Sequence, residues 1–166
     1  AAEAERFATT WTKEHPKDVG FLRYLAEGSL VRRDYAASLA YYRRALQIEP
    51  NNAMVLNNAA WTAAQLKDPK ALEYAEQANK LLPNNAAIMD TLGNIVFDKG
   101  DTTRGLELMK KAVVGAPNSP GIRLNYARAL VKAGQKDAAK KELETLQQLG
   151  DKFGGQAEVT KLMQGL

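Results

Sequence analysis

Apolar residues recur along the chain at the three- and four-residue spacing of a single helix face. The segment DYAASLAYYRRALQIEPNN, Asp34 to Asn52, carries this pattern, and related segments return along the chain. A proline follows each amphipathic segment at Pro16, Pro50, Pro83 and Pro117, so the intervals are 34, 33 and 34 residues. A near-constant period of this length predicts stacked pairs of helices.

Small residues occupy matching places in each predicted pair, where two helices can cross closely. They are Ala26, Ala60, Gly93 and Ala127 in the first helices, and Ser38, Ala71, Gly105 and Ala139 in the second helices. This pattern resembles the tetratricopeptide repeat, in which two helices cross at small residues and a proline closes the unit. The resemblance implies an all-α, right-handed superhelical solenoid of helix pairs with a C-terminal capping helix. It also implies that the first helices line a concave face.

The repeat period divides the chain into one solenoid domain, 1–166. Ala4, Ala8 and Trp11 take the places of Ser38, Tyr42 and Ala45, so 1–16 is interpreted as the second helix of an incomplete repeat in an array that extends further upstream. Four repeats are predicted at 17–52, 53–85, 86–119 and 120–150, followed by a linker and capping helix at 151–166. Terminal repeats need such a cap because their outer apolar edge has no neighbour.

Turn residues mark where the helices begin and end. The first two pairs are predicted at 19–31 with 35–48 and at 53–66 with 69–82. Asp34 and Asp101 are expected to cap helices, Gly100 and Gly134 to end them, and Pro69 to lie in a first helical turn.

Composition and charge narrow the function classes. The net charge is +4, a modest excess that does not indicate nucleic acid. The chain has no cysteine, which excludes disulfides and thiolate chemistry, and no apolar stretch long enough to span a bilayer. The start, AAEAERF, looks like a cut end from which a targeting segment could have been removed. We expect no membrane contact by this segment itself.

The sequence gives little support for catalysis, a metal or a cofactor. Asp90, Asn94 and Asp98 share one side of a helix, but three oxygen ligands on one straight helix cannot surround a cation. His15 is the only histidine and has no nucleophile or carboxylate at motif spacing. We therefore predict no enzymatic activity, no cofactor and no metal.

A basic surface is predicted on the fourth repeat. Its residues are Lys132, Lys136, Lys140 and Lys141, which could steer an acidic partner or a membrane headgroup. They lack interleaved exposed aromatic residues, so a solvated helix face is the preferred interpretation.

The first helices supply the candidate binding residues, because the resemblance places them on the concave face, where partners bind as peptides or helices. Asn58 and Asn125 hold equivalent repeat positions, and an amide can both donate to and accept from a peptide backbone. Trp61 would add apolar area, although it could instead fill a gap between repeats. The predicted set is Arg23, Tyr24, Glu27, Asn57, Asn58, Trp61, Asp90, Thr91, Asn94, Asn125 and Arg128.

The predicted function is a non-enzymatic protein-interaction scaffold for a peptide segment or helix of unknown identity. Glu27 and Asp90 place acid where the family's carboxylate clamp needs cations, so an acidic chaperone tail is a poor candidate partner. A self-assembly module and a polysaccharide-binding module using Trp61 and Tyr24 remain alternatives.

A closer resemblance rests on NNAAWTAAQLKDPKALEYAEQANKLLPNNAAIMDTLGNIVFDKGDTTRGLELMKKAV and IRLNYARALVKAGQKDAAKKELETL. These segments resemble the C-terminal arrays of bacterial repeat lipoproteins of exosortase and exopolysaccharide systems. The resemblance implies a periplasmic or outer-membrane-associated protein whose lipid anchor lies upstream. A cytoplasmic location is the alternative.

Overall fold

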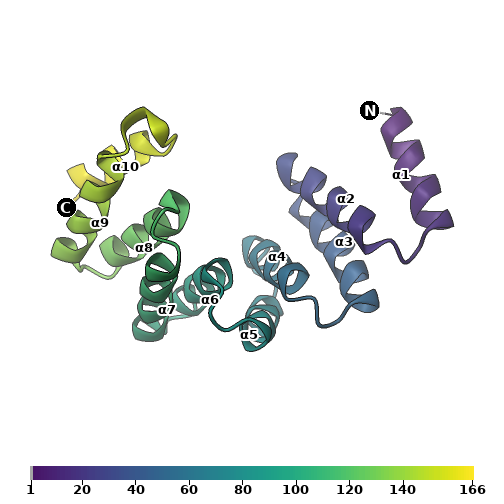
Figure 1. Cartoon of the computed structure of the whole chain (residues 1–166), viewed down its shortest axis with the longest axis horizontal. Coiled ribbons are helices and arrows are strands. Elements are labelled where there is room, and N and C mark those ends of the chain that lie inside the picture. The colour runs from purple at the N-terminus through teal and green to yellow at the C-terminus, as the bar shows by residue number, and fades with distance from the viewer. Residues whose placement is uncertain (1) are drawn as a thin grey trace. The chain divides into compact units, whose positions relative to one another are not determined.

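The structure, a computed structural model, describes residues 2–166, with the side chains of Ala2, Ala4 and Glu5 outside the described part. Over this range the chain forms ten α-helices and one short 3-10 turn, without a strand (Figure 1). The all-α prediction is confirmed. Ala1, and the place assigned to Ala4 in the incomplete first repeat, lie outside what the structure describes.

The helices group into two compact units. Unit 1 ends at Leu82 and contains five helices: α1 (Ala2–Glu14), α2 (Val19–Val31), α3 (Tyr35–Ile48), α4 (Ala53–Gln65) and α5 (Ala71–Leu81). Unit 2 begins at Pro83 and contains α6 (Ala86–Asp98), α7 (Thr102–Gly115), α8 (Pro120–Lys132), α9 (Lys136–Gln147), the 3-10 turn η1 (Gly150–Lys152) and α10 (Gln156–Gln164). One solenoid domain spanning both units stays a prediction.

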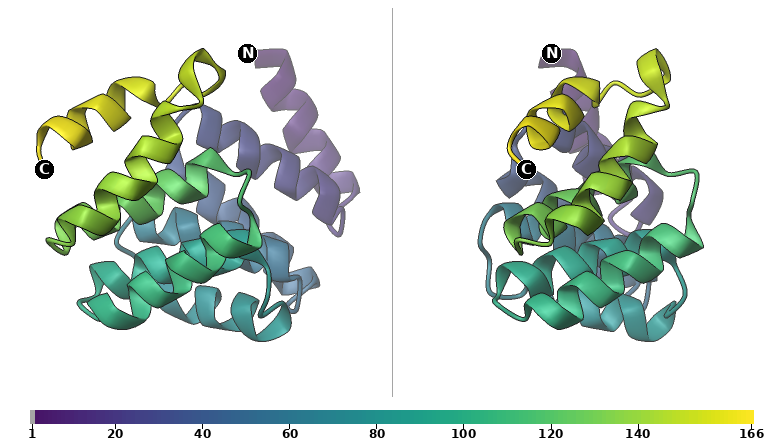
Figure 2. Two further views of the ribbon diagram at one scale, coloured as in Figure 1. Left: turned by 60° about the vertical axis from the view of Figure 1, so that its left-hand side comes forward. Right: turned by 90° about the vertical axis from the view of Figure 1, so that its left-hand side faces the viewer.

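Within each unit, consecutive helices form antiparallel pairs (Figures 1 and 2). The pairs are α2 with α3 and α4 with α5 in unit 1, and α6 with α7 and α8 with α9 in unit 2. We call the first helix of each pair the A helix and the second the B helix. The A helices are therefore α2, α4, α6 and α8.

The same turn closes every A helix. The residue after the turn donates its backbone N–H to the carbonyl five residues earlier, as in Asp34 N to Ser29 O at 2.9 Å and Asp101 N to Val96 O at 3.2 Å. This Schellman geometry puts one residue of each turn in the left-handed region, a conformation that glycine adopts without strain. The four residues are Arg33 (φ 59°), Lys67 (φ 54°), Gly100 (φ 101°) and Gly134 (φ 72°).

Side-chain caps begin most of the A and B helices. Asp34 accepts from the N–H of Ala37 at 3.0 Å, and Asp101 accepts from the N–H of Arg104 at 3.1 Å, as the sequence predicts. The prediction for Pro69 is wrong, because α5 begins at Ala71. Asp68 accepts from the backbone N–H of Lys70 at 2.9 Å, and this local turn holds Pro69 outside the helix.

In unit 2, α6 and α7 cross closely at Gly93 of α6 and Gly105 of α7. A Cβ atom built on Gly105 would lie 2.7 Å from the Cβ of Phe97 and 2.9 Å from the carbonyl oxygen of Gly93. In the other pairs, Ala26, Ala60, Ala127 and Ala139 are fully buried at the corresponding places. The glycine pair therefore lets two backbones approach where alanine would not fit.

The helix α10 covers the apolar edge of the last pair. Its Val159 is fully buried in a cluster with Leu124, Ala127, Leu143 and Leu146 of α8 and α9. Burial of such side chains stabilises by about 1.5–3 kcal/mol each. The short amphipathic helix α10 therefore shields the apolar side chains of α8 and α9.

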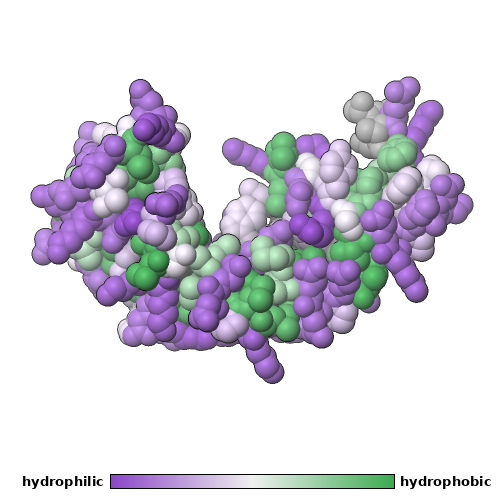
Figure 3. Space-filling model, in the orientation of Figure 1, coloured by the Kyte–Doolittle hydropathy of each residue, from purple (hydrophilic) through white to green (hydrophobic). Residues whose placement is uncertain are grey.

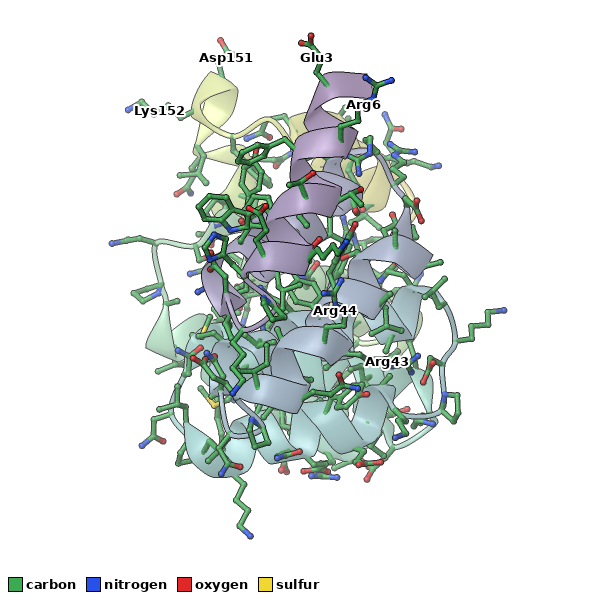
Figure 4. All side chains as sticks on the ribbon, turned by 90° about the vertical axis from the view of Figure 1, so that its right-hand side faces the viewer. Glu3, Arg6, Arg43, Arg44, Asp151 and Lys152 are labelled. Carbon is green, nitrogen blue, oxygen red and sulfur yellow. The ribbon has the colours of Figure 1, made fainter. Side chains whose placement is uncertain are left out.

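At the start of unit 1, α1 packs on α2 through aromatic side chains. The indole N–H of Trp11 donates to the Asp18 carboxylate at 3.0 Å, and the Trp11 ring lies 5.8 Å from that of Phe21. Backbone N–H donation from Phe21 and then the Trp11 bond hold the pKa of Asp18 below its usual value. Glu3 and Arg6 project from the far end of α1 (Figure 4).

Candidate functional site

The predicted binding residues all lie on the four A helices, but their contacts differ between the two units. In unit 1 they come from α2 and α4, and in unit 2 from α6 and α8. Equivalent repeat positions put these side chains on one face of each A helix. We call this surface the A-helix face of the unit concerned.

On unit 1, the A-helix face presents two exposed aromatic rings. Tyr24 of α2 is 68% exposed and stacks on Phe21, while Trp61 of α4 is 42% exposed. Tyr35 of α3 touches Trp61 edge-on, with ring centroids 6.0 Å apart. Trp61 is therefore partly exposed and also contacts the preceding repeat through Tyr35, so both interpretations of this residue stay open.

Polar side chains accompany these rings. Arg23 and Glu27 pair along α2, with 3.8 Å between Nη2 and Oε1, and both side chains are about half exposed. Asn58 of α4 is half-buried, whereas its neighbour Asn57 is buried. An exposed pair of this kind contributes little to stability.

Tyr42 of α3 is fully buried, its hydroxyl group included. Burial, and then the nearby charge of Glu27, raise the pKa of the Tyr42 hydroxyl. Asn58 lies close enough to lower that pKa, yet the hydroxyl makes no well-formed hydrogen bond. The Nε of Arg23 is likewise buried without a partner.

On unit 2, the predicted residues are joined in an internal hydrogen-bond network. Asp90 of α6 is buried and accepts from the side-chain amides of Asn94 at 3.1 Å and Asn125 at 2.7 Å. The Asn94 amide also donates to the backbone carbonyl of Asp90 at 2.8 Å. The amide of Asn125 therefore links α8 to α6 and is not directed to solvent.

The network continues into α10. Arg128 of α8 donates from Nη1 to the Asn125 side-chain oxygen at 2.9 Å, and from Nη2 to Glu158 of α10 at 2.7 Å. Its Nε donates to the other carboxylate oxygen of Glu158. Such a two-point pair is geometrically specific. It lowers the pKa of Glu158 and raises that of Arg128.

Burial dominates the chemistry of Asp90. It raises the pKa of the carboxyl group to about 6, against the lowering effects of the Asn125 and Asn94 bonds and of the Arg128 charge. The carboxyl group thus titrates about one pH unit below neutral, well above the usual range of an aspartate.

Several predicted residues have structural roles that the sequence did not reveal. The Thr91 hydroxyl donates to the carbonyl of Ala87 at 3.0 Å and is buried. Glu158, which completes the network, was not predicted, because its partner lies 30 residues away and no repeat position marks it. The one signal in the sequence was a charged residue, Glu158, next to the apolar residues Ala157 and Val159 of the predicted capping helix.

The candidate metal ligands do not converge. Asp90 and Asn94 bind each other, and Asp98 pairs with Lys132 at 3.7 Å on the surface. Among residues 2–166 with described side chains, there is no group of three histidine, cysteine or carboxylate residues placed to hold a metal ion.

A further polar cluster lies between repeats on the B-helix side of unit 1. Arg43 and Arg44 project from α3 (Figure 4), and the guanidinium of Arg43 binds Asp68 at 2.7 Å and the hydroxyl of Tyr74 at 3.4 Å. This cluster ties α3 to α5 and to the turn before it. Its contacts are internal, so we assign it to structure.

Comparison with known sequences identifies the repeat. A family profile described as tetratricopeptide repeat matches residues 96–164, and a second profile with the same description matches residues 33–52. The chain contains tetratricopeptide repeats. The match confirms the predicted repeat type, in which two helices cross at small residues and a proline closes the unit.

One relative by sequence and two solved structures are similar to this chain, all at low sequence identity. The chain is 27% identical over 105 residues to small glutamine-rich tetratricopeptide repeat-containing protein 2 of Mycosarcoma maydis, covering 61% of this chain and 30% of that protein. It superposes on MamA 41-end from Desulfovibrio magneticus RS-1 with a TM-score of 0.76 and 20% identity, covering 92% of this chain and 87% of that one. It superposes on a chain of the APC/C hetero-tetramer Cut9-Hcn1 with a TM-score of 0.81 and 17% identity, covering 98% of this chain and 32% of that one.

These likenesses establish the fold. The chain spans less than a third of the length of the fungal relative. Tetratricopeptide repeats are protein-interaction scaffolds, and this chain has that fold. No helix in the described part is both long enough and apolar enough to cross a membrane.

Proposed function

We propose that this chain is a non-enzymatic scaffold that binds a peptide segment or helix of a partner protein on the A-helix face of unit 1. The observation that carries the proposal is the exposure of Tyr24 and Trp61 on successive A helices, with the half-buried Asn58 one turn before Trp61 on α4. Exposed aromatic residues supply large contact area at small entropic cost and are enriched at binding hot spots.

The prediction of a site centred equally on both units is revised by this proposal. On unit 2, Asn125, Arg128 and Asp90 are hydrogen-bonded to one another and to Glu158. A partner that used these groups would have to break two-point contacts that hold α10. The unit 1 face offers polar groups and aromatic rings without that cost.

Peptide selection tests the proposal because it requires no identified partner. A phage library of random dodecapeptides is selected on the whole chain, and the enriched peptides are synthesised and titrated by calorimetry. Trp61→Ala and Asn58→Ala should each weaken binding about tenfold, because a buried polar group left unpaired costs about 1–3 kcal/mol and Trp61 supplies the main apolar contact.

Two control variants locate the site. The Lys140→Ser, Lys141→Ser double variant changes exposed residues of α9 and should retain full affinity. Asn125→Ala should lower stability more than affinity, since Asn125 holds Asp90. Full affinity in Trp61→Ala, together with loss in the lysine variant, would place binding on the B-helix side and contradict the proposal.

A polysaccharide partner is the second candidate, because exposed tyrosine and tryptophan rings can also stack on sugars. Figure 3 shows apolar residues interspersed with hydrophilic ones over the visible face of each unit, a surface that suits either partner. Calorimetric titration with soluble exopolysaccharide and with the selected peptides separates the two. Heat from the polysaccharide alone, abolished by Trp61→Ala, would favour the glycan.

We further propose a bacterial envelope location, supported by the resemblance of the repeat segments to those of exosortase- and exopolysaccharide-associated lipoproteins. Fractionation of the source cells tests it. Recovery of the protein in the cytosolic fraction would contradict this location and leave the peptide-binding proposal standing. A self-assembly module is tested by light scattering, where a monomer at high protein concentration would exclude it.

A further inference from the structure

A hollow of about 500 Å³ opens on unit 2, where the start of α6 lies beside the end of α7. Its apolar lining consists of Met89, Val114 and Gly115, and its polar lining includes Glu107, Lys110 and Lys111. We call it the Gly115 hollow. All of these residues belong to unit 2, and a volume of this size is typical of sites that hold a bound group.

Gly115 leaves this space open. Its repeat position carries a large aliphatic residue in each of the other three repeats, namely Ile48, Leu81 and Leu149. A Cβ atom built on Gly115 would lie 3.6 Å from the Cβ of Ala86 and 3.9 Å from the Cε of Met89, which are ordinary contact distances. Packing therefore does not require a glycine here, in contrast to Gly105, and the third repeat lacks a side chain that it has room to hold.

The neighbouring residue, Val114, departs from the repeat pattern in the complementary sense. Its side chain is 74% exposed, and its position carries a polar residue in the other repeats, namely Gln47, Lys80 and Gln148. A single exposed valine is ordinary, but this one lies at the edge of a hollow with Met89 in its lining. Apolar surface that gathers beside polar residues in this way marks an interaction site.

The polar edge of the hollow carries excess positive charge. Lys110, Lys111 and Glu107 are all exposed side chains of α7. Glu107 lies one helical turn before Lys111 and can compensate only one of the two lysine charges. Neither lysine has a carboxylate partner among the ion pairs of the described residues. The hollow therefore offers an apolar floor and an uncompensated cation.

We propose that the Gly115 hollow is a second docking surface, which takes one large apolar side chain of a partner peptide. That side chain fills the space that an aliphatic residue fills in the other repeats. A carboxylate of the same peptide, within one helical turn of the apolar residue, pairs with Lys110 or Lys111. The surface belongs to unit 2 and is independent of the proposed site on unit 1.

The test selects random dodecapeptides in parallel on the whole wild-type chain and on Gly115→Leu, which gives the third repeat the residue of its neighbours. Peptides enriched on the wild type alone should share a leucine, isoleucine, methionine or phenylalanine with an aspartate or glutamate within one turn. One such peptide is then synthesised, together with two variants that carry alanine in place of the apolar residue or the uncharged amide in place of the acid.

Calorimetric titration measures the contribution of each part of the surface. Gly115→Leu should weaken binding of the peptide about tenfold or more, because the anchoring side chain loses its buried place. Val114→Gln should weaken it about threefold by removing part of the apolar edge. The Lys110→Gln, Lys111→Gln double variant should weaken it about threefold at low salt, and less at high salt, because exposed ion pairs are weak and screened.

Matched controls show that these losses come from the hollow. Gly121→Leu adds the same side chain at the exposed start of α8, where a new Cβ meets nothing within 4 Å, and should keep full affinity. The Lys140→Gln, Lys141→Gln double variant removes two exposed lysines of α9 and should also keep it. Gly115→Leu should melt at or above the wild-type temperature, and a lower melting temperature would show that the space is not free, overturning the proposal.

The remaining outcomes separate this proposal from the function proposed for unit 1. The selected peptides should bind Trp61→Ala as tightly as the wild type, and their loss there would assign them to unit 1 and overturn the second surface. Identical peptides from both selections, or enrichment of basic residues, would overturn it as well. Self-association that Gly115→Leu abolishes, or octanoate binding without any selected peptide, would assign the hollow to a second copy or to a small amphiphile instead. In each of these cases Trp61-dependent peptides would still support the proposed function.

Discussion

The tight helix crossing in unit 2 gives a decisive test of the packing. Gly105 of α7 faces Gly93 of α6, and an alanine Cβ at Gly105 would lie 2.7 Å from the Cβ of Phe97 and 2.9 Å from the carbonyl oxygen of Gly93. Carbon atoms in favourable contact are about 3.5–4.0 Å apart. Backbone atoms cannot rotate out of the way, so the helices α6 and α7 must separate.

Two effects oppose each other in Gly105→Ala. Alanine stabilises a helix interior by about 0.8–1 kcal/mol relative to glycine. Overpacking a close contact costs about 1–3 kcal/mol, with backbone clashes toward the upper end. The clash should win, and we expect the free energy of unfolding to fall by about 2 kcal/mol.

Gly28→Ala is the matched control, because Gly28 lies inside α2 where the nearest neighbour of a new Cβ is the flexible end of Arg32 at 3.6 Å. That variant should gain up to about 1 kcal/mol from helix propensity. Urea unfolding followed by circular dichroism measures both variants. The packing argument is refuted if Gly105→Ala matches or exceeds the wild type in stability.

Single features of the two units give three further predictions. Arg33→Gly and Lys67→Gly should each raise the free energy of unfolding by about 1 kcal/mol, because both residues are held at positive φ. Gly100→Ala should lower it by a similar amount, for the same reason. Urea unfolding measures all three, and equal effects of the three variants would contradict this prediction. Val159→Ala should cost about 2 kcal/mol by loss of buried methyl groups under α10, with the exposed Thr160→Ala as a neutral control in the same thermal melts. Asp90 has its pKa raised to about 6, so the folded state holds this proton more tightly than the unfolded chain and stability falls as pH rises from about 4 to 6. In Asp90→Asn, the loss of stability between pH 4.5 and pH 7.5 should be smaller by about 2 kcal/mol, and an unchanged pH profile would show that Asp90 titrates normally.

The helix positions could be predicted because they depend on the spacing of residues that are close together in the sequence. Apolar spacing places α2 and α3 at the residues where the structure begins and ends them. The capping roles of Asp34 and Asp101 depend on a residue and its neighbour three positions on, which a sequence displays directly. The start of α5 was misplaced because Asp68 makes a turn bond to Lys70, and proline tolerance alone does not distinguish a turn from a first helical turn.

The partners of polar side chains were not predictable in the same way. Arg128 was expected on an open binding face, but Glu158 of α10 binds it across 30 residues. Tyr42 was expected to fill space, and its ring is indeed fully buried, but the state of its hydroxyl depends on Asn58 of another helix. Repeat periodicity fixes which face a side chain takes, whereas hydrogen bonding depends on which group stands on the adjacent helix.

Asn58 and Asn125 show how that adjacent group decides the outcome. They hold the same repeat position, and each is preceded 35 residues earlier by a charged residue of the previous A helix, Arg23 or Asp90. The Asp90 carboxylate can only accept, so it takes the amide hydrogens of Asn125 and draws that side chain into the protein. The Arg23 guanidinium can only donate, so the Asn58 amide hydrogens find no acceptor there. One charge reversal at a single repeat position therefore gives Asn125 an acceptor on the previous A helix that Asn58 lacks.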